Sequence, residues 1–259
     1  MKHVKLVAIG YHSISHPSNT AELHGDFYKK LSLSAVLFEE HIRYLKDANY
    51  TFLQFHDILS VRNGAMQIPK KPALIYFDDG FRDTLLNAYP LLKKWNIPAT
   101  IFVTTDFVGQ KSLPRWAEGH TPKTAPIFLS WDDVRSMRDV FEIGSHAVTH
   151  RRFIKLSYDE MKEELIASRA RIEKEIGEPP VAFSFPHSAW NEESKRAVLE
   201  AGYRIAVGVG RGYNYGSRSV FLKKIPIGSQ DDSFLLRKKL RYLPILEGWR
   251  RIIGLCKTT

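Results

Sequence analysis

Strand-like and helix-like segments alternate along most of this 259-residue chain. Short apolar runs rich in Val, Ile and Phe predict strands, and apolar residues that recur every three or four positions predict the helices between them. The predicted strands are 4–10, 50–55, 73–77, 99–103, 140–143, 181–185 and 203–207, and the predicted helices begin near residues 35, 85, 131, 157 and 191. Because such alternation with short connections produces parallel strands, the pattern predicts a doubly wound sheet or a (β/α) barrel.

Composition limits the classes of protein to which the chain can belong. Its length suits one large α/β domain. The single cysteine, Cys256, excludes an intrachain disulfide and a zinc site built on several thiolates. The apolar run 6–9 is too short for the core of a signal peptide, and no run approaches the ~18 apolar residues that span a membrane. We therefore expect a cytoplasmic protein.

Positive charge is concentrated near the C-terminus. Residues 237–259 hold seven Lys or Arg and one acid, which gives +6 of the total net charge of +10. This distribution argues against a basic face across the main domain, and we expect no nucleic-acid partner. We predict a main domain over 1–230 and a basic amphipathic helical tail over 231–259, bent or interrupted at Pro244 and Gly248. The tail would either contact an anionic membrane surface or cover the main domain.

Two short motifs carry metal-binding chemistry. Phe77-Asp78-Asp79-Gly80 closes one predicted strand, and Gly144-Ser145-His146-Ala147-Val148-Thr149-His150 follows another. An Asp-Asp-Gly turn or a pair of surface histidines would each be ordinary alone. Both motifs, however, lie at the carboxyl ends of predicted parallel strands, where α/β folds gather their active sites. One carboxylate and two imidazoles leave open positions on a divalent ion, where water becomes a nucleophile near neutral pH, and the second carboxylate can take its proton.

With these motifs the chain resembles the polysaccharide deacetylases, the carbohydrate esterase family with the NodB homology domain, over residues 11–226. The resemblance implies a distorted (β/α) barrel that removes an N-acetyl group from an amino sugar or N-acetylated glycan, releasing acetate and a free amine. It also implies that Asp78 is the catalytic base and that Asp79, His146 and His150 hold one divalent metal ion. Zinc is the expected metal, although some members of the family use cobalt or nickel.

The family's third motif, aromatic-x-Pro-Tyr, is altered in this chain to Ser184-Phe185-Pro186-His187-Ser188. The proline is retained, but tyrosine has become histidine and the usual arginine is missing. The backbone N–H of His187 can still stabilise an oxyanion, whereas the shape of the acetyl pocket and the setting of the base are expected to differ. Pro186, Trp190 and Trp131 are candidate substrate-binding residues, and core packing is the alternative role for the two tryptophans.

The general acid is assigned through a subgroup of the family. No histidine follows His187, so the usual C-terminal acid is absent from the sequence. The chain is most similar to the permuted poly-N-acetylglucosamine deacetylases, which carry a Tyr-His pair on the first strand, and Tyr11-His12 matches that pair. The resemblance therefore implies that His12 is the general acid.

Two other functions remain open from the sequence. The same chemistry could act on another amide, such as a formamide or a lipid-linked amide. A catalytically silent carbohydrate-binding barrel is the alternative from a different class. Such a binding protein would need neither two adjacent aspartates, nor two metal-binding histidines, nor an acid, and their joint presence favours a hydrolase.

Overall fold

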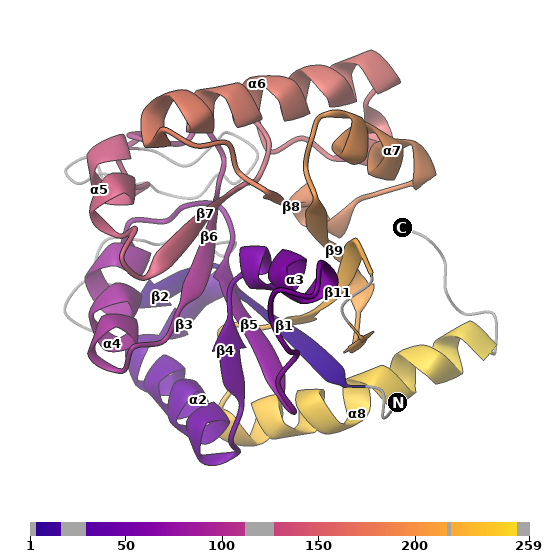
Figure 1. Cartoon of the computed structure of the whole chain (residues 1–259). Helices are drawn as coiled ribbons and strands as arrows, with labels where there is room; N and C mark the ends of the chain where they lie inside the picture. The colour runs from indigo at the N-terminus through magenta and orange to yellow at the C-terminus, as the bar shows by residue number, and fades with distance from the viewer. Residues whose placement is uncertain (1–3, 17–29, 112–126, 217–218, 253–259) are drawn as a thin grey trace.

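Seven parallel strands close into a barrel in the computed structural model, which describes residues 4–16, 30–111, 127–216 and 219–252 (Figure 1). Side chains are described through residue 242. Because β1 pairs with both β5 and β11, the sheet closes, which confirms the barrel and excludes the doubly wound sheet. The barrel strands, in order around the barrel, are β1 (Lys5–Tyr11), β5 (Pro72–Phe77), β6 (Ala99–Val103), β7 (Phe141–Ser145), β8 (Ala182–Ser184), β9 (Ile205–Arg211) and β11 (Phe221–Pro226).

Short strands extend the barrel at its margins. β4 (Thr51–Leu53) adds to the start of β5, and β10 (Asn214–Tyr215) pairs antiparallel with the start of β1. A separate parallel pair is formed by β2 (Ser13–Ser15) and β3 (Ser32–Ser34). The sequence did not predict β2, β3, β10 or β11.

Helices surround the barrel, as Figure 1 shows. The helices predicted to begin near 35, 85, 131, 157 and 191 are all present, and the second of them opens with a π-helical turn. Four begin at a residue whose side chain caps the helix: Ser34, Ser130, Ser157 and Asn191. The helices are α2 (Ala35–Asp47), α3 (Phe55–Arg62), η2 (Thr84–Ala88), α4 (Tyr89–Lys94), α5 (Trp131–Ser136), η4 (Phe153–Lys155), α6 (Tyr158–Ile176), η5 (Pro186–Ser188), α7 (Glu192–Glu200) and α8 (Ser233–Ile252).

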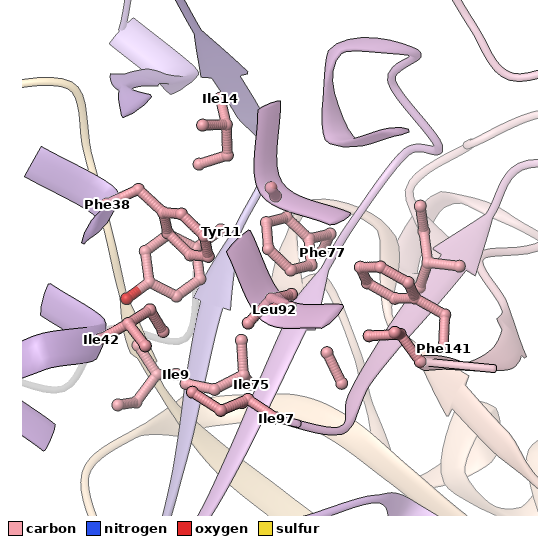
Figure 2. Packing of buried hydrophobic residues seen from close by; sticks show 14 of the residues in the cluster. Ile9, Tyr11, Ile14, Phe38, Ile42, Ile75, Phe77, Leu92, Ile97 and Phe141 are labelled. Carbon is pink, nitrogen blue, oxygen red and sulfur yellow. The ribbon is translucent and has the colours of Figure 1, made fainter. Parts of the chain in front are cut away.

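Alternate residues of each strand face opposite layers, as the two-residue repeat of a strand requires. The outward residues of β1 and β5, such as Ile9, Ile75 and Phe77, pack against Phe38 and Ile42 of α2 (Figure 2). The inward residues of six barrel strands meet in a second cluster that fills the lumen: Leu6, Ala8, Leu74, Tyr76, Phe102, Ala182, Ile205, Val207 and Leu222. The barrel is therefore a packed core rather than a channel.

The lumen is closed at the amino ends of the strands by α3, which lies across the centre of the barrel in Figure 1. Phe55 contributes the plug, since its ring lies 5.2 Å from that of Phe102 and 6.1 Å from that of Tyr76, centroid to centroid. The half-buried Glu142 carboxylate accepts the backbone N–H groups of Phe55 (2.7 Å) and His56 (3.1 Å) and so holds the first turn of α3. The predicted strand over 50–55 is correspondingly shorter than expected, because this helix begins at its end.

The predicted tail lies partly on the barrel. Leu236 and Leu240 of α8 are buried in the outer core cluster, and the Lys239 ammonium donates to Asp231 (2.5 Å) and to the Pro226 carbonyl (2.7 Å). The first turns of α8 therefore cover the barrel, while the boundary at residue 230 stays a prediction. Of the predicted bend or interruption, the interruption was wrong, because α8 runs through residues 244 and 248 to Ile252, and the bend stays a prediction. Within the described ranges, no helix is long and apolar enough to span a membrane.

Candidate metal centre and active site

The site lies at the carboxyl ends of the strands, opposite the α3 plug. On β1 and β5, the residues that continue the inward-facing series beyond the apolar lumen are His12 and Asp78. On β7 the corresponding residue beyond Gly144 is His146. The backbone N–H of Asp78 donates to the Tyr11 carbonyl (3.0 Å), which holds the ends of β1 and β5 together. The apolar filling of the barrel thus ends in a layer of titratable groups.

Two glycines allow aromatic side chains of the lumen to pack directly beneath the titratable groups of the site. A Cβ on Gly144 would overlap the ring of Phe102, and a Cβ on Gly10 would overlap the phenol of Tyr76. Glycine is therefore required at both positions for the two aromatic rings to pack directly beneath the site.

Asp79, His146 and His150 converge as the sequence predicted. One ligand atom from each lies within 4.8 Å of the other two, and all three residues are buried. The Nε2 atoms of His146 and His150 lie 3.4 and 3.1 Å from Oδ1 of Asp79. Burial alone would raise the pKa of Asp79, but the two histidines outweigh it and hold that pKa well below its usual range. The group therefore presents an anionic oxygen and two imidazole nitrogens to a common point.

The donor set fits a divalent transition metal. Nδ1 of His146 donates to the Ser184 carbonyl at 2.7 Å, which leaves Nε2, the atom that faces Asp79, as the ligand nitrogen. Metal-binding histidines ordinarily use their second nitrogen in this way, because the bond fixes both tautomer and ring orientation. Two imidazoles and one carboxylate with an open position are the ligands of catalytic zinc sites. The residues present would thus accept the metal that the sequence predicts.

Strained backbone concentrates in the loops that carry the site. Seven non-glycine residues of the described ranges have positive φ, and five of them are in these loops: Asp79, Ala147, His150, His187 and Ser188. The left-handed region disfavours a Cβ, and such residues persist where surrounding contacts hold them. Ligand geometry here consequently depends on the contacts that stabilise each loop.

Glu164 of α6 stabilises the histidine loop, and the sequence analysis did not identify it. Its Oε2 accepts the backbone N–H groups of Val148 (2.8 Å) and Thr149 (2.9 Å), and Oε1 accepts the Thr149 hydroxyl. Glu164 is buried, and the two backbone N–H groups that it accepts lie between His146 and His150 in the sequence. One glutamate among the many acids of α6 gives no sequence signal of this role.

Asp78 and His12 lie beside the metal-binding group. Nε2 of His12 is 4.0 Å from Oδ2 of Asp78, and Asp78 is buried. Burial lowers the pKa of His12 below its ordinary value, against the opposing effect of Asp79 and Asp78. Both residues therefore stand next to the three ligands, as a base and an acid acting on one bound molecule must. Their catalytic roles stay predictions.

The third motif lies against the same group. Pro186 is buried, and the ring of His187 lies 4.5 Å from that of His150, centroid to centroid. His187 as a whole is exposed, but partial desolvation of its ring beside the site, followed by the charge of His150, lowers its pKa to about 3. The histidine that replaces the usual tyrosine is therefore an uncharged ring at the edge of the metal-binding group.

The two candidate tryptophans make packing contacts. Trp190 packs on the cluster that contains Phe153 and Phe183, and the Lys195 ammonium lies 4.0 Å from its ring centroid. Trp131 packs against the outer core cluster, with the Arg171 guanidinium 5.8 Å from its ring. Substrate binding by Trp190, Trp131 and Pro186 stays a prediction.

Comparison with known sequences agrees with this geometry. The family model described as polysaccharide deacetylase matches residues 65–206. YxkH of Bacillus subtilis strain 168, whose name places it among the polysaccharide deacetylases, is 26% identical over 207 residues, or 80% of this chain and 65% of that relative. A poly-β-1,6-N-acetyl-D-glucosamine N-deacetylase of Staphylococcus aureus strain MSSA476 is 24% identical over 178 residues, or 68% of this chain and 60% of that relative. The chain thus spans less than two thirds of either relative.

Solved structures share the fold. A de-N-acetylase from Aggregatibacter actinomycetemcomitans superposes with a TM-score of 0.78 at 21% identity, covering 91% of this chain and 100% of that one. The Streptococcus pyogenes deacetylase PplD, solved with acetate, gives a TM-score of 0.74 at 21% identity, covering 93% and 100%. These likenesses show the barrel, and the family model covers more than half of the chain. This protein therefore belongs to the polysaccharide deacetylase family.

Proposed function

We propose that this protein is a metal-dependent hydrolase that removes N-acetyl groups from an amino sugar or N-acetylated glycan and releases acetate and a free amine. The observation that carries the proposal is the convergence of Asp79, His146 and His150 beside a second buried carboxylate. A carbohydrate-binding barrel would gain nothing from burying two adjacent carboxylates, because each costs desolvation energy unless it is paired. A hydrolase needs one to bind the metal and one to move a proton.

Each residue of the site has a role in this proposal. The ion held by Asp79, His146 and His150 would supply a Lewis acid for the acetyl carbonyl and lower the pKa of water at the site. Asp78 takes the proton of the attacking water. The His187 backbone N–H donates to the oxygen of the acetyl group as negative charge develops there.

His12 protonates the nitrogen that leaves. Because burial lowers the pKa of His12, its protonated form is a stronger acid than an ordinary imidazolium and gives its proton readily to the amine that leaves. The 4.0 Å between His12 and Asp78 lets the two groups act on opposite bonds of one tetrahedral centre.

The substrate class is proposed from the family and from the named relatives. One relative is named as an N-deacetylase of poly-β-1,6-N-acetyl-D-glucosamine, which makes β-1,6-linked N-acetylglucosamine oligomers the first substrates to test. β-1,4-linked oligomers and peptidoglycan fragments are the other glycans, and a simple formamide and a lipid-linked N-acetyl sugar represent the alternative amides.

The experiment measures acetate, or formate, released from each substrate by zinc-loaded protein, with Asp78→Asn as the matched control. Acetate release from a glycan by wild type and its loss in Asp78→Asn supports the proposal. Release from the formamide alone would replace it with deformylation. Glycan binding without release of acid would favour the silent carbohydrate-binding barrel.

A further inference from the structure

The outer face of α8 combines exposed apolar side chains with exposed positive charge. Leu236 and Leu240 face the barrel and are buried. On the opposite side of the helix, Phe234, Lys238 and Tyr242 follow one another at four-residue spacing and form a single column. Phe234 is 58% exposed and Tyr242 is 44% exposed, and Leu235 lies beside them at 36%. This side of α8 therefore presents large apolar groups to solvent.

Cations cover the same column. The Lys238 ammonium lies 4.5 Å from the ring centroid of Phe234, and the Arg241 guanidinium lies 5.3 Å from that of Tyr242. Arg237, also exposed, lies over the ring of Tyr44 on the neighbouring helix α2. Lys239 differs from these three, because it is half-buried and pairs with Asp231. The outward cations are thus stacked on aromatic faces.

We infer that this face of α8 docks on an anionic phospholipid surface. Aromatic side chains insert at the boundary of headgroups and acyl chains, while Lys and Arg reach back to the phosphates, so one surface satisfies both parts of the column. A second copy of this chain would bring like charges together. A nucleic acid would pair with the cations but would leave the exposed Phe234, Leu235 and Tyr242 without an apolar partner.

The exposed apolar side chains and the cations lie on the same side of α8, so both would meet a flat membrane surface together. The helix α8 lies along the outside of the barrel (Figure 1), whereas the candidate metal group lies at the carboxyl ends of the strands. Docking through α8 therefore requires no rearrangement of the barrel or of that group. Further along the sequence, beyond the described side chains, large apolar residues follow at three- and four-residue spacing: Ile245, Trp249 and Ile252.

The test is co-sedimentation of the full chain with vesicles of phosphatidylcholine, with and without phosphatidylglycerol, at low and high salt. Two variants separate the contributions: Lys238→Glu/Arg241→Glu for the charge and Phe234→Ser/Tyr242→Ser for the apolar column. Lys70→Glu/Lys174→Glu is the matched control, because it makes the same change of net charge at exposed positions elsewhere. Thermal unfolding confirms that each variant folds.

Wild type is expected to bind the phosphatidylglycerol vesicles at low salt and to dissociate at high salt. A cation near an anionic surface changes the partition coefficient about fivefold, so Lys238→Glu/Arg241→Glu should weaken binding by at least ~25-fold. Phe234→Ser/Tyr242→Ser should also bind more weakly, and the control should bind as wild type does.

Three results would overturn the inference. They are wild type that stays in the supernatant with anionic vesicles at low salt, a control as defective as the Lys238→Glu/Arg241→Glu variant, and tighter binding to a DNA duplex than to the vesicles. None of these results bears on the proposed hydrolase, because all the substitutions lie outside the catalytic group.

Discussion

Replacing Glu164 with leucine should loosen the metal-binding loop without touching a metal ligand. The substitution removes the acceptor of two backbone N–H groups, those of Val148 and Thr149, which lie between the two histidines. Both residues are half-buried, so water can reach part of the exposed backbone. We therefore take about 1 kcal/mol for each lost hydrogen bond, the ordinary net value, or about 2 kcal/mol together.

That energy is expected to appear in metal affinity, because the loop must hold His146 and His150 in place for binding. About 2 kcal/mol corresponds to a ~30-fold higher dissociation constant for zinc, within the range of about 10- to 100-fold found for residues that support metal ligands. Competition with a chromogenic chelator measures the constant, and thermal unfolding shows whether the variant folds.

Glu164→Gln is the matched control. Its amide oxygen can accept both backbone N–H groups, and its NH₂ group can donate to the Thr149 hydroxyl, so affinity should stay close to that of wild type. A folded Glu164→Leu variant that binds zinc as tightly as wild type would refute the proposed role of Glu164.

Four further substitutions test other parts of the structure. Asp78→Asn and His12→Ala should each lower kcat by roughly 10²- to 10⁴-fold while the zinc content stays unchanged, and near wild-type turnover in either would refute its assigned role. Gly144→Ala should lower the free energy of unfolding in urea by about 1–3 kcal/mol, because its Cβ would overlap the Phe102 ring, and an unchanged midpoint would contradict that packing. His56→Ala tests a charge interaction: hydrogen bonds to Asp57 and Glu142 raise the pKa of His56 to about 10, above its ordinary 6.5. A group whose pKa is higher in the folded protein than in the unfolded chain stabilises the fold fully at pH values below the unfolded-chain pKa. That stabilisation is lost as the pH rises through the folded-state pKa. The loss of unfolding free energy in His56→Ala should therefore be largest below pH 6.5 and vanish above about pH 10. Because the side chain is half-exposed, the largest loss should stay below ~1 kcal/mol. A loss that does not change with pH would contradict this assignment.

The sequence predicted those features that depend on local patterns. Apolar runs located six of the seven barrel strands, and the Asp-Asp and His-x₃-His motifs identified Asp79, His146 and His150, the group that could hold a metal ion. The strand β11 was missed because Lys223 and Lys224 interrupt its apolar run, and its strand pairing with β1 and β9 overrides that composition.

Other features depend on residues that are distant in sequence. The helix α3 begins where it does because Glu142, on β7, accepts the N–H groups of its first turn. The support that Glu164 gives to the histidine loop likewise appears only when α6 is packed beside β7. Neither contact leaves a local pattern in the sequence, so neither could have been predicted from it.

The most direct test of the central claim is a zinc titration of acetate release by chelator-stripped protein acting on an N-acetylglucosamine oligomer. We predict that stripped protein is inactive, that activity saturates at about one equivalent of zinc per chain, and that His146→Ala recovers no activity at that concentration. Full turnover by stripped protein, or equal recovery by His146→Ala, would contradict the assignment of Asp79, His146 and His150 as the catalytic metal centre.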